Sequence, residues 1–126
     1  MKNIGLIGCG NIAETYFRAQ EYFNNINFVS CADINLDAAK KTAEQYNIIP
    51  LSVDEILNDK NVDIILNLTI PQAHYEISKR ALESNKHVYC EKPMSVKFDE
   101  AKELLNLAKK NSLYIGNAPD TFLGGG

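Results

Sequence analysis

Strand-like and helix-like segments alternate along the whole sequence, and this alternation restricts the possible folds more than any other feature. Short apolar runs alternate with longer segments whose apolar residues recur every three or four positions, as on one face of a helix. The runs that predict strands are residues 4–7, 28–32, 48–51, 62–68, 87–90 and 113–115. The segments that predict helices are residues 11–23, 36–46, 54–57, 72–83 and 98–109.

This alternation is typical of a parallel sheet with helices on both faces. The near-continuous apolar character of the strands agrees, because a parallel strand is buried on both sides. With right-handed crossovers, six strands fit the doubly wound (Rossmann) α/β fold, with strand order 3-2-1-4-5-6. Ligands of such sheets bind in the crevice at the carboxyl ends of the strands. The residues that follow each strand are therefore the candidates for a binding site.

The first strand leads into a glycine-rich turn of the kind that binds phosphate groups. The turn is Gly8-Cys9-Gly10-Asn11-Ile12-Ala13. A first glycine permits a sharp turn, a second lets the backbone approach a pyrophosphate, and a small third residue lets the helix pack on the strand. The helix then directs its N-terminal N–H groups and positive dipole end toward the phosphates. The pattern indicates a dinucleotide site, although glycines also occur at ordinary strand-to-helix turns.

An acidic residue follows the second strand, where a dinucleotide site requires one. Asp33 lies twenty residues after Ala13, which matches the expected separation of about 20 residues. We expect its carboxylate to accept hydrogen bonds from the adenosine ribose and to repel a 2′-phosphate, so NAD is favoured over NADP. The alternative is that Asp33 caps the next helix or lies in a solvated loop.

Three further strand ends would lie on the same edge of the sheet. They are Asn67-Leu68-Thr69, Glu91-Lys92-Pro93 and Asn117-Ala118. Lys92 would lie where the nicotinamide end of a dinucleotide reaches. There its ammonium can hold a substrate hydroxyl or a developing carbonyl oxygen by a charge-assisted hydrogen bond, with Glu91 orienting it. The simpler interpretation of this segment is a surface pair of opposite charges in a loop.

Composition argues against several other functions. The 126-residue chain has a formal net charge of −3 and no basic cluster, so the electrostatic footprint of nucleic-acid binding is missing. No apolar run approaches the roughly 20 residues of a membrane span, and the N-terminus does not read as a secretory signal, so we expect a cytoplasmic protein. Three cysteines without metal-ligand spacing predict small buried side chains and no metal site.

The motifs together resemble those of the Gfo/Idh/MocA oxidoreductases, a family that includes glucose–fructose oxidoreductase and inositol dehydrogenase. The resemblance extends over essentially all 126 residues. Besides the glycine turn it rests on Ala32-Asp33, Val62-Asp63, Pro71-Gln72-Ala73-His74, Asn85-Lys86-His87-Val88, Glu91-Lys92-Pro93 and residues 118–126. It implies the NAD-binding domain of a dehydrogenase that transfers a hydride between nicotinamide and a sugar, polyol or similar hydroxy or keto substrate.

The resemblance also implies roles for individual residues. Lys92 would be the catalytic residue. Many members place the histidine one residue further from the proline than His74 is from Pro71. The alternative to a cofactor contact is that His74 simply lies near the first turn of the helix after the fourth strand. Asn85 stands where a glycine is common, and asparagine also adopts the left-handed cap conformation. The residues that would contact the cofactor are Gly8, Gly10, Asn11, Ile12, Asp33, Leu68, Thr69, His74, Glu91 and Lys92.

Enzymes of this family are considerably longer than this chain, and their second domain supplies substrate contacts and usually a histidine general base. We therefore expect residues 1–118 to form the dinucleotide-binding domain and residues 119–126 to begin the connection to a missing domain. The isolated chain would then be inactive, and the whole enzyme would be a homo-oligomer acting on a small molecule. The alternative is a free-standing NAD(H)-binding sensor or scaffold without catalysis, in which Glu91-Lys92-Pro93 would have no purpose.

Overall fold

Strands and helices alternate along the structure, as the sequence predicts. The computed structural model describes residues 2–9, 17, 25–91 and 97–118. The helix expected over residues 11–23 lies outside the described residues except for Phe17. In chain order the elements are β1 (Lys2–Ile7), β2 (Ile26–Ala32), α2 (Leu36–Tyr46), β3 (Ile49–Pro50), α3 (Val53–Asn58), β4 (Ile64–Asn67), α4 (Pro71–Glu83), β5 (His87–Glu91), α5 (Phe98–Lys110) and β6 (Ile115–Ala118).

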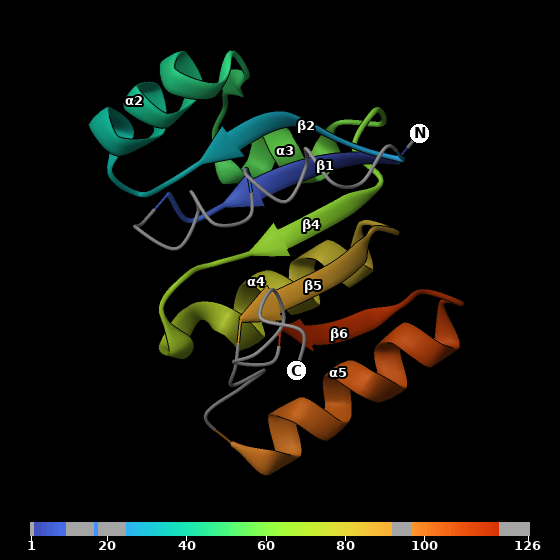
Figure 1. Ribbon diagram of the computed structural model, residues 1–126. Coiled ribbons are helices and arrows are strands. Elements are labelled where there is room, and N and C mark those ends of the chain that lie inside the picture. Colours follow the sequence, from blue (N-terminus) through green and yellow to red (C-terminus); the bar gives the residue numbers. More distant parts are fainter. Residues whose placement is uncertain (1, 10–16, 18–24, 92–96, 119–126) are drawn as a thin grey trace.

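The six strands form one parallel sheet in the order β3-β2-β1-β4-β5-β6 (Figure 1), which confirms the predicted order. Strand β1 pairs with β2 on one side and with β4 on the other, so that Ile7 lies opposite both Ala32 and Asn67. Asn67 in turn lies opposite Cys90 of β5. The carboxyl ends of these strands therefore meet at one edge, and the strand order reverses between β1 and β4.

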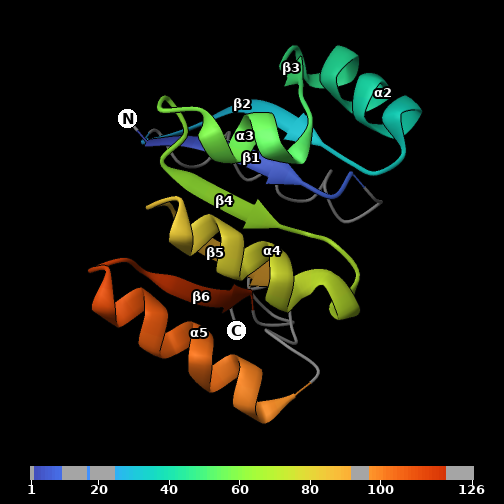
Figure 2. The same cartoon turned by 180° about the vertical axis from the view of Figure 1, so that it is seen from behind.

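Helices cover both faces of the sheet. Helices α3, α4 and α5 pack on one face, which is turned toward the viewer in Figure 2, and their apolar residues share one buried cluster with the strands. Ala43 of α2 and Phe17 pack in a second cluster on the other face. Within β4, Ile65 belongs to the first cluster and its neighbour Leu66 to the second. Both faces of the strands are thus buried, which explains their near-continuous apolar sequence.

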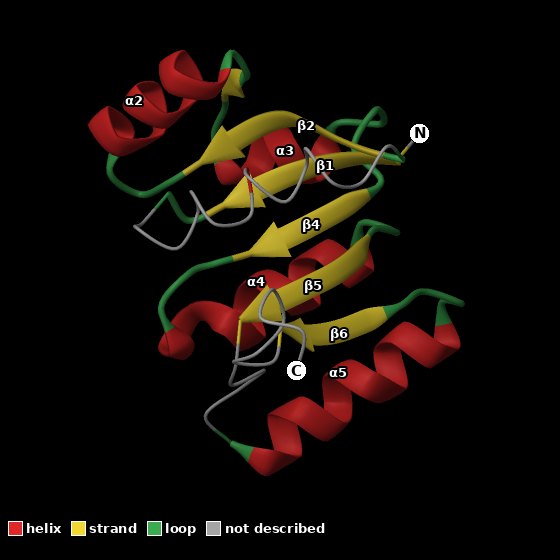
Figure 3. Cartoon of the chain, viewed as in Figure 1, coloured by secondary structure: helices red, strands yellow, loops and turns green. Residues whose placement is uncertain are grey.

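Two helices mark the ends of the sheet. Figure 3 shows α2 beside β2 and β3 at one end, and α5 beside β6 at the other. No helix in the described part of the chain is long and apolar enough to cross a membrane.

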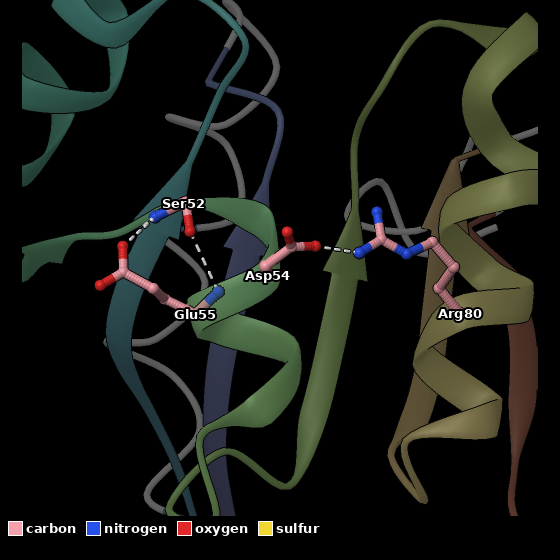
Figure 4. Close-up of polar contacts among 4 residues, drawn as sticks. All are labelled: Ser52, Asp54, Glu55 and Arg80. Atoms are coloured by element: carbon pink, nitrogen blue, oxygen red, sulfur yellow. Dashed lines mark hydrogen bonds and ion pairs between the residues drawn. The ribbon is translucent and has the colours of Figure 1, made fainter.

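Helix α3 begins with a capping box, whose sequence pattern is Ser52 followed three residues later by Glu55. The N–H of Glu55 donates to the Ser52 hydroxyl at 3.1 Å, and the N–H of Ser52 donates to the Glu55 carboxylate at 2.8 Å (Figure 4). The same view shows Asp54 of α3 paired with Arg80 of α4. Exposed ion pairs of this kind stabilise little, so the positions of α3 and α4 depend mainly on the apolar cluster beneath them.

The segment between α4 and β5 has a structural role. It lies at the edge of the sheet where the strands begin, opposite their carboxyl ends. Asn85 has a φ of 62°, the left-handed conformation expected where glycine is common. Lys86 is buried, and its ammonium donates to the carbonyl oxygens of Asp59 at 2.7 Å and Val62 at 2.8 Å. Burial lowers the pKa of Lys86, because it disfavours the charged ammonium. Lys86 therefore fixes the loop that leads into β4.

All six strands differ by at least one residue from the bounds that the sequence predicts, and for two of them the structure shows the reason. The strand expected over residues 62–68 is shorter, because Val62 and Leu68 are buried without belonging to β4. The strand expected over residues 113–115 lies later in the chain, because Leu113 instead closes the turn after α5 by donating its N–H to a carbonyl of that helix at 2.8 Å. An apolar sequence indicates that residues are buried, whereas a strand also requires backbone hydrogen bonds to a neighbouring strand.

Candidate functional site

Gly8 begins the turn after β1 and lies against the loop after β4. Its φ of 102° is one that L side chains rarely adopt. A Cβ at this position would lie 2.6 Å from the carbonyl carbon of Leu68 and 2.9 Å from the amide nitrogen of Thr69. Hydrogen bonds of 2.8 Å hold the same junction, from Gly8 N–H to the Ala32 carbonyl and from Leu68 N–H to the Ile7 carbonyl. The fold itself therefore requires glycine at position 8.

Asp33 joins the end of β2 to the glycine turn. One carboxylate oxygen accepts the N–H of Cys9 at 2.7 Å, and the other accepts the N–H of Asn35 at 2.8 Å. The N-cap of α2 is Asn35, whose side chain accepts from the N–H groups of Asp37 and Ala38. The alternative that Asp33 caps this helix is therefore wrong. An ionised carboxylate offers about four acceptor sites, so Asp33 retains the capacity to accept further hydrogen bonds.

The loop after β4 is held by hydrogen bonds on both sides of Thr69. The N–H of Thr69 donates to the side-chain oxygen of Asn67 at 3.2 Å, and the carbonyl oxygen of Thr69 lies 2.6 Å from Nε2 of His74. His74 is only 1% exposed, so its ring lies in the interior of the protein and contacts the loop from that side. Leu68 is buried in the second apolar cluster. Direct contact of His74 with a cofactor stays a prediction, and its burial argues instead for an action through Thr69.

Asn67 belongs to one of the strand ends that the sequence places at this edge, but the sequence assigns it no contact of its own. Its side chain is fully buried, although the rest of β4 is apolar. It contacts Thr69, His74 and Ser78 through hydrogen bonds. A single amide in an apolar strand is itself a signal of such contacts, because buried polar groups are almost always hydrogen-bonded.

Several predicted site residues lie outside the described residues. These are Gly10, Asn11, Ile12 and Lys92, together with the side chain of Glu91. The backbone of Glu91 ends β5 opposite Ala118, on the same edge as Gly8 and Asp33. The contacts of these residues with a cofactor or substrate stay predictions.

The three cysteines differ in burial, and Cys9 and Cys31 also differ in acidity. Cys31 and Cys90 are buried, as the sequence predicts, whereas Cys9 in the glycine turn is half-buried. A hydrogen bond between the side chains of Cys31 and Cys9 lowers the pKa of Cys9 and raises the pKa of Cys31, and burial opposes the first shift and adds to the second. Among the described residues, no group of three or more potential metal ligands comes together.

We expect iodoacetamide to label Cys9 of the folded chain before Cys31 and Cys90. The thiolate is the reactive form, and Cys9 combines a lowered pKa with partial exposure. The rate should therefore rise with pH through a pKa below that of an ordinary exposed cysteine. Peptide mass spectrometry after timed quenching measures this order. In denaturant the three thiols should react alike, and earlier labelling of Cys31 or Cys90 in the folded chain would contradict the structure.

A glycine turn at the point where a doubly wound sheet reverses its strand order, with a carboxylate after the second strand, is the arrangement of Rossmann domains that bind dinucleotides. A family model described as "Oxidoreductase family, NAD-binding Rossmann fold" matches residues 2–118. The chain therefore belongs to the Gfo/Idh/MocA family, and the resemblance seen in its sequence is confirmed.

Individual relatives match the chain over part of their own length. The uncharacterized oxidoreductase YrbE of Bacillus subtilis is 28% identical over 113 residues, which are 88% of this chain and 33% of the relative. Inositol 2-dehydrogenase of Salmonella typhimurium is 26% identical over 111 residues, 85% of this chain and 33% of the relative. The crystal structure of KijD10, a 3-ketoreductase from Actinomadura kijaniata in complex with NADP and TDP-benzene, has a TM-score of 0.85 at 28% identity and covers 92% of this chain and 36% of that one. The chain thus spans about a third of the length of these proteins.

Proposed function

We propose that this chain is the cofactor-binding domain of an NAD-dependent dehydrogenase that acts on a polyol, a sugar or a similar hydroxy or keto compound. The family is one of NAD-binding oxidoreductases, and its members include an inositol 2-dehydrogenase. The observation that carries the proposal is the 2.7 Å hydrogen bond from Cys9 N–H to the Asp33 carboxylate. This contact brings an acceptor suited to a ribose and a turn suited to phosphates into one site.

The described residues at this edge fit a dinucleotide. The positive φ of Gly8 supplies the sharp turn with which a phosphate-binding loop begins. The unused acceptor sites of Asp33 suit the hydroxyls of a ribose. Ile34 and Leu36, which are 98% and 65% exposed, provide apolar surface beside Asp33 for an adenine ring.

The same residues favour NAD over NADP. A 2′-phosphate would meet the carboxylate of Asp33, and residues 33–39 contain two aspartates but no lysine or arginine to neutralise it. The side chain that follows Asp33 is Ile34, which offers no charge. The similar KijD10 structure contains NADP, so likeness in fold does not select the cofactor. The preference rests on residues of this chain.

The catalytic contribution of this chain is assigned to the residues after β5. Bound NAD would supply the hydride acceptor, or as NADH the donor. Lys92 would donate a hydrogen bond to the reacting oxygen of the substrate and stabilise the charge that develops there, and Glu91 would orient the ammonium. The chain matches 33% of the length of the inositol dehydrogenase, so we assign the general base and most substrate contacts to a part of the enzyme beyond this chain. We further propose that the whole enzyme is a homo-oligomer.

Calorimetric titration with NAD⁺, NADH, NADP⁺ and NADPH tests the proposal. We expect the chain to bind NAD⁺ at least about tenfold more tightly than NADP⁺, because placing two like charges together is unfavourable. Asp33→Asn keeps an acceptor for the N–H of Cys9 but removes the charge, and should reduce this preference. Asp33→Ala removes both and should also weaken NAD⁺ binding.

Asp37→Asn provides the matched control. Asp37 is exposed in the first turn of α2, so this change removes an equal charge nearby while the Asp33 carboxylate stays in place. The preference for NAD⁺ should remain. If NADP⁺ binds the unmodified chain as tightly as NAD⁺, the proposed cofactor preference is wrong. If none of the four nucleotides binds, the proposal of a cofactor-binding domain is wrong.

A further inference from the structure

Asn67 uses every hydrogen-bonding group of its side-chain amide. Its Oδ1 accepts from the N–H of Thr69 at 3.2 Å and from the Thr69 hydroxyl at 2.6 Å. Its Nδ2 donates to the carbonyl oxygen of His74 at 3.1 Å and to the Ser78 hydroxyl at 3.0 Å. An amide has two donors and an oxygen with two lone pairs, so this buried side chain is fully satisfied. One residue at the end of β4 thus ties the following loop to α4.

The loop is held from its other side by the same helix. Nε2 of His74 lies 2.6 Å from the carbonyl oxygen of Thr69. A carbonyl oxygen can only accept, so this ring nitrogen carries the proton. The main chain of Thr69 is therefore fixed at its N–H by Asn67 and at its carbonyl by His74. Both anchors are buried, with 0% and 1% exposure respectively, and buried hydrogen-bond networks of this kind are rigid.

The loop that these bonds fix is the one that touches the glycine turn. A Cβ on Gly8 would lie 2.6 Å from the carbonyl carbon of Leu68, 2.7 Å from its oxygen and 2.9 Å from the nitrogen of Thr69. The peptide between Leu68 and Thr69 therefore forms a wall directly beside the turn. In Figure 1 this loop leaves the sheet beyond the arrowhead of β4, next to the end of β1. A shift of the loop would change the space at the turn.

We propose that Asn67 is a positioning residue for the cofactor site, which acts through Thr69 to set the distance between the loop after β4 and the turn at Gly8. The inference rests on the proposed binding of NAD at this edge. A leucine at position 67 would keep the branched shape of the side chain, but it would leave the N–H and hydroxyl of Thr69 without their acceptor. The hydrogen-bonding groups of the amide are therefore what holds the loop.

The test compares NAD⁺ affinity with folding stability in two variants of β4. Asn67→Leu removes the amide, whereas Ile65→Val removes one methylene from the same strand, where Ile65 is buried in the cluster beneath α4. Calorimetric titration gives the Kd for NAD⁺ and thermal unfolding gives the Tm. We expect Asn67→Leu to raise the Kd about tenfold, because buried groups lose their partners. We expect Ile65→Val to lower the Tm but to change the Kd by less than about twofold, because it leaves the loop in place.

A double-mutant cycle tests whether the action passes through Thr69. Thr69→Val removes the hydroxyl that donates to Asn67 and keeps the shape of the side chain. We expect it to raise the Kd about threefold in the unmodified chain, and hardly at all in the Asn67→Leu background, because contacting residues are not additive. Full additivity would show that the hydroxyl acts on the cofactor directly and would overturn the proposal. Asn67→Ser takes the place of Asn67→Leu in both tests if the leucine variant does not fold.

The outcomes separate this inference from the proposed function. If the unmodified chain binds NAD⁺ and Asn67→Leu binds it equally well, Asn67 has no positioning role and the proposed function stands. If the unmodified chain does not bind NAD⁺, the proposed function is wrong and this inference is wrong with it. A loss of affinity in Asn67→Leu that Ile65→Val does not share, at similar Tm, supports both.

Discussion

Gly8→Ala is expected to destabilise the chain by about 2–5 kcal/mol, from unfavourable backbone conformation and overpacking together. The φ of Gly8 is 102°, and the added Cβ would lie 2.6 Å from the carbonyl carbon of Leu68. The atoms in the way belong to the backbone, so no side-chain rotation relieves the contact. Either the loop after β4 or the end of β1 must move. This is a large part of the roughly 5–15 kcal/mol by which domains are stable.

Gly116→Ala is the matched control for this substitution. Gly116 lies in β6, and a Cβ there would approach the ring of Tyr89 no closer than 3.4 Å, which is ordinary contact. We expect a change in stability of less than about 1 kcal/mol, because no strain is introduced. Urea unfolding followed by circular dichroism measures both variants. Equal midpoints for the two alanine variants would show that the turn and the loop after β4 are not packed as the structure places them.

The strand order and the position of Gly8 could be predicted because both follow from local patterns. Parallel strands place their carboxyl ends on one edge, so the residues after each apolar run are brought together by the fold class alone. The separation between the glycine turn and Asp33 was enough to place that carboxylate beside the turn. The Ser52 cap was likewise readable, because a capping box involves residues only three positions apart.

The hydrogen bonds around Asn67 could not be predicted in the same way. His74 and Ser78 are four residues apart and share one face of α4, which the sequence does show. That this face meets Asn67 depends on how α4 rotates over the sheet, and this is set by the packing of the whole apolar cluster. The expectation that His74 lies along a cofactor followed from the family resemblance. A resemblance assigns a residue to a site, but it does not show that the side chain is buried, as that of His74 is.

Lys92→Ala in the whole protein is expected to lower kcat by about 10²–10³-fold, the usual effect of removing one donor to a charge that develops in the transition state. Lys92 is expected at the nicotinamide end of the cofactor, where its proposed hydrogen bond goes to the reacting oxygen of the substrate. The Kd for NAD⁺ should therefore change by less than about twofold, because a group that acts on the transition state does not alter ground-state binding. Steady-state kinetics with inositols and sugars, together with calorimetric titration of NAD⁺, separates these two quantities.

Lys110→Ala controls for the loss of a lysine as such, because Lys110 is exposed in the last turn of α5, at the end of the helix that leads to the start of β6; it should leave both quantities unchanged. A sensor or scaffold without catalysis would bind NAD(H) equally well with Lys92 or alanine and would show no hydride transfer to lose. Full kcat in the Lys92→Ala variant would therefore remove Lys92 from the mechanism. Binding of NAD(H) by the whole protein without turnover of any tested polyol or sugar would favour the sensor, because the glycine turn and Asp33 serve either function and only the residues after β5 distinguish them.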